Sequence, residues 1–148
     1  MADKLALHKH TRPGKVLSFE QKGEFFYRRG LDRLDQNKLA DALCNYRLAG
    51  ERDPGNEEIL LAMAEVLTEM ERFDESNRIL FALVRRAEHD PECYFGMGCN
   101  FMGLNDLTHA KDALERYAEL EPEGTFTYDA YDMLDAIDEA EYYRMGPP

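Results

Sequence analysis

The chain of 148 residues contains no tryptophan, only three cysteines and no apolar run long enough to form a membrane-spanning helix. Its cysteines, Cys44, Cys93 and Cys99, have neither the spacing of a zinc site nor the even number of a disulfide framework. We therefore expect reduced thiols buried in the core. Four scattered histidines form no catalytic set, and no glycine-rich phosphate loop or nucleophile motif is present. The sequence predicts no bound metal, no cofactor and no enzymatic activity.

Basic residues are also scarce: 18 lysines and arginines stand against 30 aspartates and glutamates, a formal net charge of −12. Residues 1–17 carry four of these basic groups and one acid (+3), so residues 18–148 carry 14 and 29 (−15). This acidity disfavours nucleic acids and anionic membranes as partners, because both attract cationic surfaces. His8, Lys9 and His10 interrupt the apolar start of the chain, which therefore lacks a signal-peptide pattern, and we expect a cytoplasmic protein.

Two sets of small residues recur along the chain. The first set is Gly30, Ala64 and Gly98, and the second is Ala42, Ser76 and Ala110. The interval in residue number is the same throughout, because 64 − 30, 98 − 64, 76 − 42 and 110 − 76 all equal 34. Apolar residues surround them at helical spacing, and two antiparallel helices approach closely only where one side chain is small. The pattern therefore predicts helical hairpins in which the first set faces the second.

In this period and in these packing residues the chain resembles tetratricopeptide repeat proteins over roughly residues 23–124. The resemblance implies an all-α fold, a right-handed superhelical array of antiparallel helix hairpins (an α-solenoid) with about seven helices. We expect a basic N-terminal arm, residues 1–17, followed by a single domain, residues 18–145. The expected parts of the domain are repeats at about 23–56, 57–90 and 91–124 and a capping helix at about 125–145.

The two ends of the chain leave alternatives open. Ser18 and Gln21 predict a capping box at the start of the first repeat helix. The preceding arm is either disordered or places Leu5 and Leu7, with their basic neighbours, in the acidic groove of this or a neighbouring molecule. The apolar stripe of the last predicted helix either covers the edge of the last hairpin or docks a partner or a second copy.

The family resemblance also implies where a ligand binds. In tetratricopeptide repeat proteins the first helix of each hairpin forms most of the concave face, one turn either side of the small packing residue. The positions implied here are Glu24, Tyr27, Leu31, Leu34, Glu58, Leu61, Glu65, Thr68, Glu92, Phe95, Cys99 and Met102, with Met133 at the end of the groove. This predicted surface combines carboxylates with apolar and aromatic side chains.

One known subgroup of the family grips the acidic C-terminal tails of heat-shock chaperones with a clamp of Lys, Asn, Asn, Lys and Arg. The matching positions in this chain are Tyr27, Leu31, Ala62, Glu92 and Gly96, so we do not expect that mode of binding. A partner segment with basic and apolar residues suits the predicted groove better, because its charge is complementary.

We therefore expect a non-catalytic protein–protein interaction module, either an adaptor or a small chaperone. In size, repeat number and acidity the chain is similar to bacterial secretion chaperones of this family. The alternative is a structural scaffold that associates with itself, for example as a homodimer, through its groove or its last helix.

Overall fold

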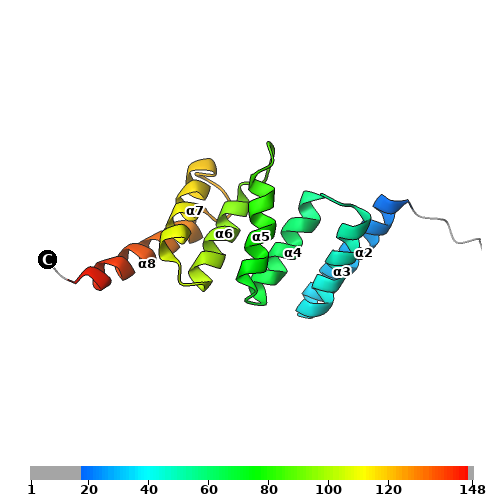
Figure 1. The fold of residues 1–148 in the computed structure, drawn as a ribbon, viewed down its shortest axis with the longest axis horizontal. Coiled ribbons are helices and arrows are strands. Elements are labelled where there is room, and N and C mark those ends of the chain that lie inside the picture. The colour runs from blue at the N-terminus through cyan, green and yellow to red at the C-terminus, as the bar shows by residue number, and fades with distance from the viewer. Residues whose placement is uncertain (1–17, 147–148) are drawn as a thin grey trace, which may run out of the picture.

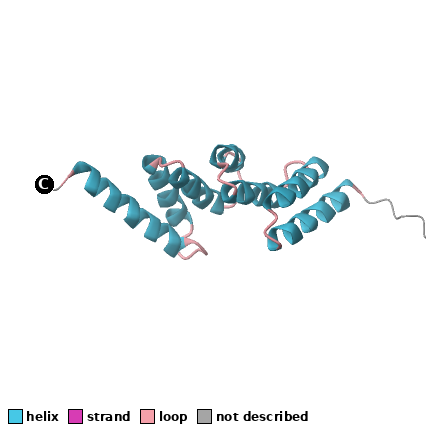
Figure 2. Ribbon diagram, turned by 90° about the horizontal axis from the view of Figure 1, so that it is seen from below, coloured by secondary structure: helices cyan, strands magenta, loops and turns pink. Residues whose placement is uncertain are grey.

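The computed structural model describes residues 18–146, and the predicted basic arm, residues 1–17, lies outside them. Within the described part the chain forms seven α-helices and no strand. They are α2 (Phe19–Asp35), α3 (Leu39–Arg52), α4 (Glu57–Glu69), α5 (Phe73–Val84), α6 (Glu92–Gly103), α7 (Leu107–Leu120) and α8 (Thr127–Met145). The helices follow one another in a row along the long axis of the molecule (Figure 1), and Figure 2 shows the same row from below. The predicted all-α array of helical hairpins is confirmed.

Helices α2 and α3 form the first hairpin, α4 and α5 the second, and α6 and α7 the third, and each hairpin packs on the next. Gly30 lies where the first two helices are close: a Cβ atom on it would stand 2.4 Å from the ring of Tyr46. In the third hairpin a Cβ atom on Gly98 would stand 2.6 Å from Leu114. We expected these glycines to face small residues such as Ala42. Their nearest partner is instead a large side chain one helical turn farther along, because each glycine leaves a gap that this side chain fills.

The turns within the three hairpins repeat one backbone conformation at the interval of the small residues, since 71 − 37 and 105 − 71 also equal 34. Asn37, Glu71 and Asn105 have φ angles of 57°, 58° and 56°. In each turn the N–H of this residue donates to the carbonyl three residues earlier, and the next N–H donates to the carbonyl five residues before it. These bonds form the Schellman motif, which ends a helix at a left-handed residue. Asparagine adopts that conformation more readily than glutamate, so Glu71 occupies the least favourable of the three turns.

Polar side chains mark the start of two first helices. The Ser18 hydroxyl accepts from the Gln21 N–H (3.2 Å), and the Gln21 side-chain oxygen accepts from the Ser18 N–H (2.9 Å). The predicted capping box is therefore confirmed. Asn56 caps α4 in a similar way by accepting from the Ile59 N–H (3.2 Å).

The last helix, α8, packs on α7. Its Ala130 and Ile137 are fully buried together with Leu114 and Tyr117 of α7. The Tyr117 hydroxyl also accepts from the Phe126 N–H (3.0 Å), which holds the turn before α8. The C-terminal end of α8 projects beyond α7 (Figure 1), and the large side chains there are exposed. The part of α8 up to Ile137 thus covers the apolar edge of the third hairpin.

The cysteines differ from the expectation at one position. Cys44 is exposed on α3, whereas Cys93 is buried and Cys99 is partly buried. The expectation for Cys44 was wrong because Leu43, its neighbour on the helix, occupies the inward position. Burial raises the pKa of the Cys93 thiol to about 12 and that of the Cys99 thiol to about 11, so both remain protonated near neutral pH.

Candidate functional site

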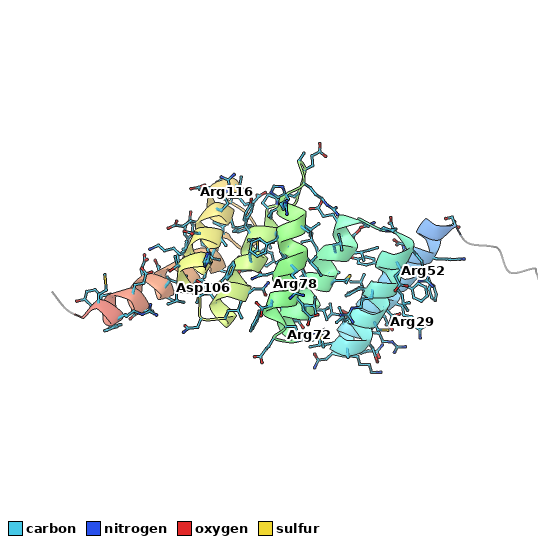
Figure 3. All side chains as sticks on the ribbon, viewed as in Figure 1. Arg29, Arg52, Arg72, Arg78, Asp106 and Arg116 are labelled. Atoms are coloured by element: carbon cyan, nitrogen blue, oxygen red, sulfur yellow. The ribbon has the colours of Figure 1, made fainter. Side chains whose placement is uncertain are left out.

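Two helices that begin a hairpin, α4 and α6, carry acidic residues and no basic ones. Helix α4 carries four glutamates and no lysine or arginine, and Glu92 is the single charged residue of α6. The five arginines labelled in Figure 3 belong to α2, α3, α7 and the N-cap and middle of α5. Helices α4 and α6 therefore form a neighbouring pair with no cation of their own.

A hollow of about 250 Å³, here called the α4–α6 hollow, lies between these two helices. It is lined by Leu61, Ala64, Glu65, Thr68, Glu69, Leu80, Glu92, Phe95, Gly96, Cys99 and Phe126. Phe95 stacks on Phe126 with the ring centroids 4.6 Å apart, and this pair forms the aromatic end of the hollow. The walls are mostly apolar, with three carboxylates among them.

A second hollow, of about 180 Å³ and here called the α2–α4 hollow, lies on the other side of α4. It is lined by Tyr27, Leu31, Leu34, Tyr46, Glu58, Leu61, Ala62 and Glu65. The Tyr27 hydroxyl donates to Glu58 Oε1 (3.1 Å). Partial burial, together with this bond and the Glu58 charge, raises the pKa of Tyr27 to about 12. Leu61 and Glu65 line both hollows, so one face of α4 separates them.

A third hollow, of about 480 Å³, lies beside the start of α4. It is lined by Glu57, Glu58, Leu61, Glu88, His89 and Asp90. Glu57 Oε1 accepts from the Asp90 N–H (2.6 Å), which ties the segment before α6 to α4. Leu61 borders all three hollows, which together are called the acidic groove below.

The carboxylates of the groove lack ion-pair partners within the described residues, 18–146. None of the ion pairs between described residues involves Glu58, Glu65, Glu69 or Glu92. Partial burial raises the pKa of Glu65, and the charges of Glu92, Glu69 and Asp90 raise it further. Burial also raises the pKa of Glu92, with smaller contributions from Asp90 and Glu121. Both shifts mean that these carboxylates carry negative charge at a cost that a bound cation would reduce.

A buried polar layer holds the base of the α4–α6 hollow. Thr68 Oγ1 donates to Asn100 Oδ1 (2.6 Å), and Asn100 Nδ2 donates to Ser76 Oγ and to Asn77 Oδ1 (2.8 Å each). Ser76 Oγ in turn donates to the carbonyl oxygen of Ala64 (2.9 Å), which brings the small residues of the second hairpin together as predicted. These bonds connect α4, α5 and α6 and so fix the spacing of the hollow's walls.

Ten of the predicted groove residues line the hollows, and three do not. The ten are Tyr27, Leu31, Leu34, Glu58, Leu61, Glu65, Thr68, Glu92, Phe95 and Cys99. Glu24 is exposed and pairs instead with Arg28 one turn along α2 (2.6 Å). Met102 and Met133 pack against the apolar core that α7 shares with α8. That a ligand binds at the ten remains a prediction.

The lining residues that the sequence did not predict include Tyr46, Leu80 and Phe126, none of which belongs to the first helix of a repeat. Leu80 of α5 reaches the α4–α6 hollow beside Gly96, where a Cβ atom would stand 3.0 Å from the leucine. Gly96, which lies on the predicted concave face, was therefore the sequence signal that a side chain from a second helix of a hairpin could enter the groove.

Metal binding and membrane insertion find no support in residues 18–146. No group of three or more His, Cys, Asp or Glu side chains there is arranged to hold a metal ion. No helix in that part of the chain is long and apolar enough to cross a membrane. What the geometry provides is apolar cavities edged by carboxylates, an arrangement suited to binding through contact and charge.

Comparison with known proteins identifies the helical array. The family model of the tetratricopeptide repeat matches residues 33–94, which contain α3, α4 and α5 with the adjoining ends of α2 and α6. Residues 33–94 of the chain therefore contain the tetratricopeptide repeat.

The chain is similar to a longer protein that contains the repeat and to solved structures of about its own length. It is 26% identical over 130 residues to the TPR repeat-containing protein YvcD of Bacillus subtilis (strain 168); the match covers 87% of this chain and 27% of that protein. The chain thus spans about a quarter of the length of this curated relative. The first TPR of Spaghetti (RPAP3) bound to the HSP90 peptide SRMEEVD is 24% identical, with a TM-score of 0.73 over 82% of this chain and 94% of that one. PcrH from Pseudomonas aeruginosa is 17% identical, with a TM-score of 0.72 over 83% and 96%.

The positions that match the chaperone-tail clamp all lie in the acidic groove of this protein. Tyr27, Leu31 and Ala62 line the α2–α4 hollow, and Glu92 and Gly96 line the α4–α6 hollow. None of these five side chains is a cation or an amide. The groove therefore lacks the groups that would neutralise the carboxylates of an acidic peptide.

Proposed function

We propose that this protein is a non-catalytic interaction module of the tetratricopeptide repeat type, an adaptor or small chaperone, that binds a basic and apolar segment of a partner in the acidic groove. The observation that carries the proposal is the combination of apolar hollows with carboxylates that have no ion-pair partner among residues 18–146. The RPAP3 domain of similar fold binds a short peptide, which supports a peptide segment as the ligand. The negative charge of the groove supports a positively charged segment.

Both parts of the groove contribute to such binding. An apolar side chain that enters a hollow is removed from water, which contributes about 1.5 to 3 kcal/mol before the cost of ordering the ligand. A lysine or arginine close to Glu65 or Glu92 would relieve the repulsion between these carboxylates. The same charges would increase the rate of encounter with a basic partner and decrease it with an acidic one.

A self-associating scaffold is the second candidate, and the exposed aromatic residues of α8 favour it. Tyr128, Tyr142 and Tyr143 are 84%, 54% and 73% exposed. The same helix carries six acidic residues and one arginine, so two copies that met there would bring like charges together. Peptide binding in the groove therefore has the better support. A dimer that resists dilution in light scattering would favour the scaffold instead.

Titration of the full-length protein with three fluorescent synthetic peptides tests the proposed function. One peptide contains leucines and arginines, the second contains the same leucines with glutamates, and the third keeps the arginines but has serines in place of the leucines. Fluorescence anisotropy should show strong binding of the first peptide alone. Equal binding of the acidic peptide, or no binding of the basic and apolar one, would contradict the proposal.

Paired variants locate the binding site. Leu61→Ser should weaken binding about tenfold or more, since losing the burial of one apolar contact costs at least about 1.4 kcal/mol. Leu120→Ser, at the exposed end of α7, is the matched control and should bind normally. For the charges, Glu65→Gln with Glu92→Gln should weaken binding, whereas a double Gln variant at Glu115 and Glu123 changes the net charge equally and should not. Circular dichroism checks that each variant is folded.

A further inference from the structure

The α2–α4 hollow and the α4–α6 hollow lie on either side of one wall. Leu61 and Glu65 line both of them and stand one turn apart on the same face of α4. With volumes of about 180 and 250 Å³, each hollow is far smaller than a two-turn helix, which occupies roughly 800 Å³ at a diameter of about 10 Å. Each hollow therefore suits a single side chain, and the pair suits an extended ligand better than a helical one.

The spacing of the hollows sets the spacing of the ligand's anchors. Because α4 separates them, their centres are about one helix-packing distance apart, about 8 to 10 Å. A chain in the polyproline II conformation advances about 3.1 Å per residue with three residues per turn. Two side chains three residues apart therefore lie about 9 Å from each other on the same side of the ligand, which matches the distance between the hollows.

Charge distinguishes the wall from the rest of the groove. Glu65 borders both hollows, whereas Glu69 and Glu92 border the α4–α6 hollow and Glu58 borders the α2–α4 hollow. Glu65 is also absent from the ion pairs between described residues. A lysine or arginine between the two anchors begins about 120° around the ligand from them, and its long, flexible side chain reaches back to Glu65, the carboxylate that borders both hollows.

We propose that the ligand of the acidic groove is an extended segment with two apolar side chains three residues apart and an arginine or lysine between them. One apolar side chain occupies each hollow, and the cation pairs with Glu65. The proposal rests on the proposed function and adds an order and a spacing to the ligand's composition.

Four synthetic peptides of identical composition test this order. Each contains two leucines and one arginine in a background of glycine, serine and threonine. The first has the leucines three residues apart with the arginine between them, and the second keeps this spacing with the arginine outside. In the third the leucines are adjacent, and in the fourth they are seven residues apart, the spacing for one face of a helix. Isothermal titration calorimetry with the full-length protein should show the first peptide binding about tenfold more tightly than each of the others.

The outcomes separate this proposal from the proposed function. Equal affinities for all four peptides, or tightest binding of the seven-residue spacing, would overturn the spacing and leave a basic and apolar ligand in place. Absence of binding by all four would contradict the proposed function as well.

Variants of two glutamates of α4 supply an independent readout. Glu65→Gln should remove the preference for the inner arginine, so that the first and second peptides bind equally. Glu69→Gln, in the same stretch of α4 but beside one hollow, should lower affinity while keeping that preference. A preference that survives Glu65→Gln would place the cation elsewhere and overturn the assignment.

Discussion

Gly30 occupies a point at which the first two helices leave no room for a side chain. A Cβ atom there would stand 2.4 and 2.5 Å from two ring atoms of Tyr46, which is fully buried. Gly30→Ala must therefore displace the tyrosine ring or the backbone of α2. Such overpacking costs about 1 to 3 kcal/mol, and urea unfolding followed by circular dichroism should show a free energy of unfolding reduced by that amount.

Gly50, in α3, provides the matched control for Gly30. The nearest atoms to a Cβ atom there are 3.8 Å away on Ile59 and 3.9 Å away on Met63, which is ordinary van der Waals contact. Gly50→Ala should therefore stabilise the protein by about 0.5 to 1 kcal/mol, because alanine loses less conformational freedom in a helix. A similar loss of stability in both variants would contradict the packing described for Gly30.

The repeat pattern predicted the packing residues and the hairpins because close helix contacts require particular residue types at particular intervals. It did not predict that Tyr46 fills the gap at Gly30. The spacing of the small residues indicates which face of each helix packs, but not which turn of the partner helix makes the contact. Leu80 enters the groove because of the way in which α5 crosses α6. The apolar periodicity of a single helix carries no information on that crossing. Cys44 was misplaced because the repeat period alone does not determine the rotation of α3 at every position.

At the scale of the elements, the junction of the second and third hairpins contains a buried polar layer beside its apolar core, whereas the matching positions of the first hairpin and α4 are apolar. Asn100, Ser76 and Asn77 are at most 5% exposed and hydrogen-bonded to one another. The residues one repeat earlier are Val66, Ala42 and Leu43, all buried. Asn100→Val alone should leave the buried amide oxygen of Asn77 without its hydrogen bond and remove one bond each from Ser76 and Thr68, which keep their bonds to the Ala64 carbonyl. The expected cost is about 1 to 3 kcal/mol in urea unfolding, since buried polar groups lose their hydrogen bonds.

The first junction of the chain supplies the control for this prediction. Replacing the whole polar layer by the residues found one repeat earlier gives Thr68→Leu, Ser76→Ala, Asn77→Leu and Asn100→Val together. This variant should be more stable than Asn100→Val, because no buried polar group remains unpaired and the four effects are therefore not additive. The four single variants should also be measured. If the loss of unfolding free energy in the fourfold variant equals the sum of the losses in the four single variants, the layer does not act as one network.

For the molecule as a whole, we expect negative charge both to limit stability and to select the proposed ligand. The chain has a net charge of −12, and two of its carboxylates, Glu65 and Glu92, have raised pKa values in the groove. The folded protein therefore takes up protons at these two groups at a higher pH than the unfolded chain does. Their contribution to stability should increase as the pH falls from neutral, through their folded pKa values, toward the usual glutamate range.

Affinity for a basic peptide should change in the opposite direction over the same pH range. A bound lysine or arginine favours the ionised carboxylates, so protonation of Glu65 and Glu92 removes the charge that attracts it. Anisotropy titrations of the arginine and leucine peptide should show affinity falling on acidification. The variant with Glu65→Gln and Glu92→Gln should bind more weakly at neutral pH and depend less on pH, and its stability should lack the gain on acidification expected from these groups. Affinity that is unchanged or increases as the pH falls would mean that these two carboxylates do not hold the cation.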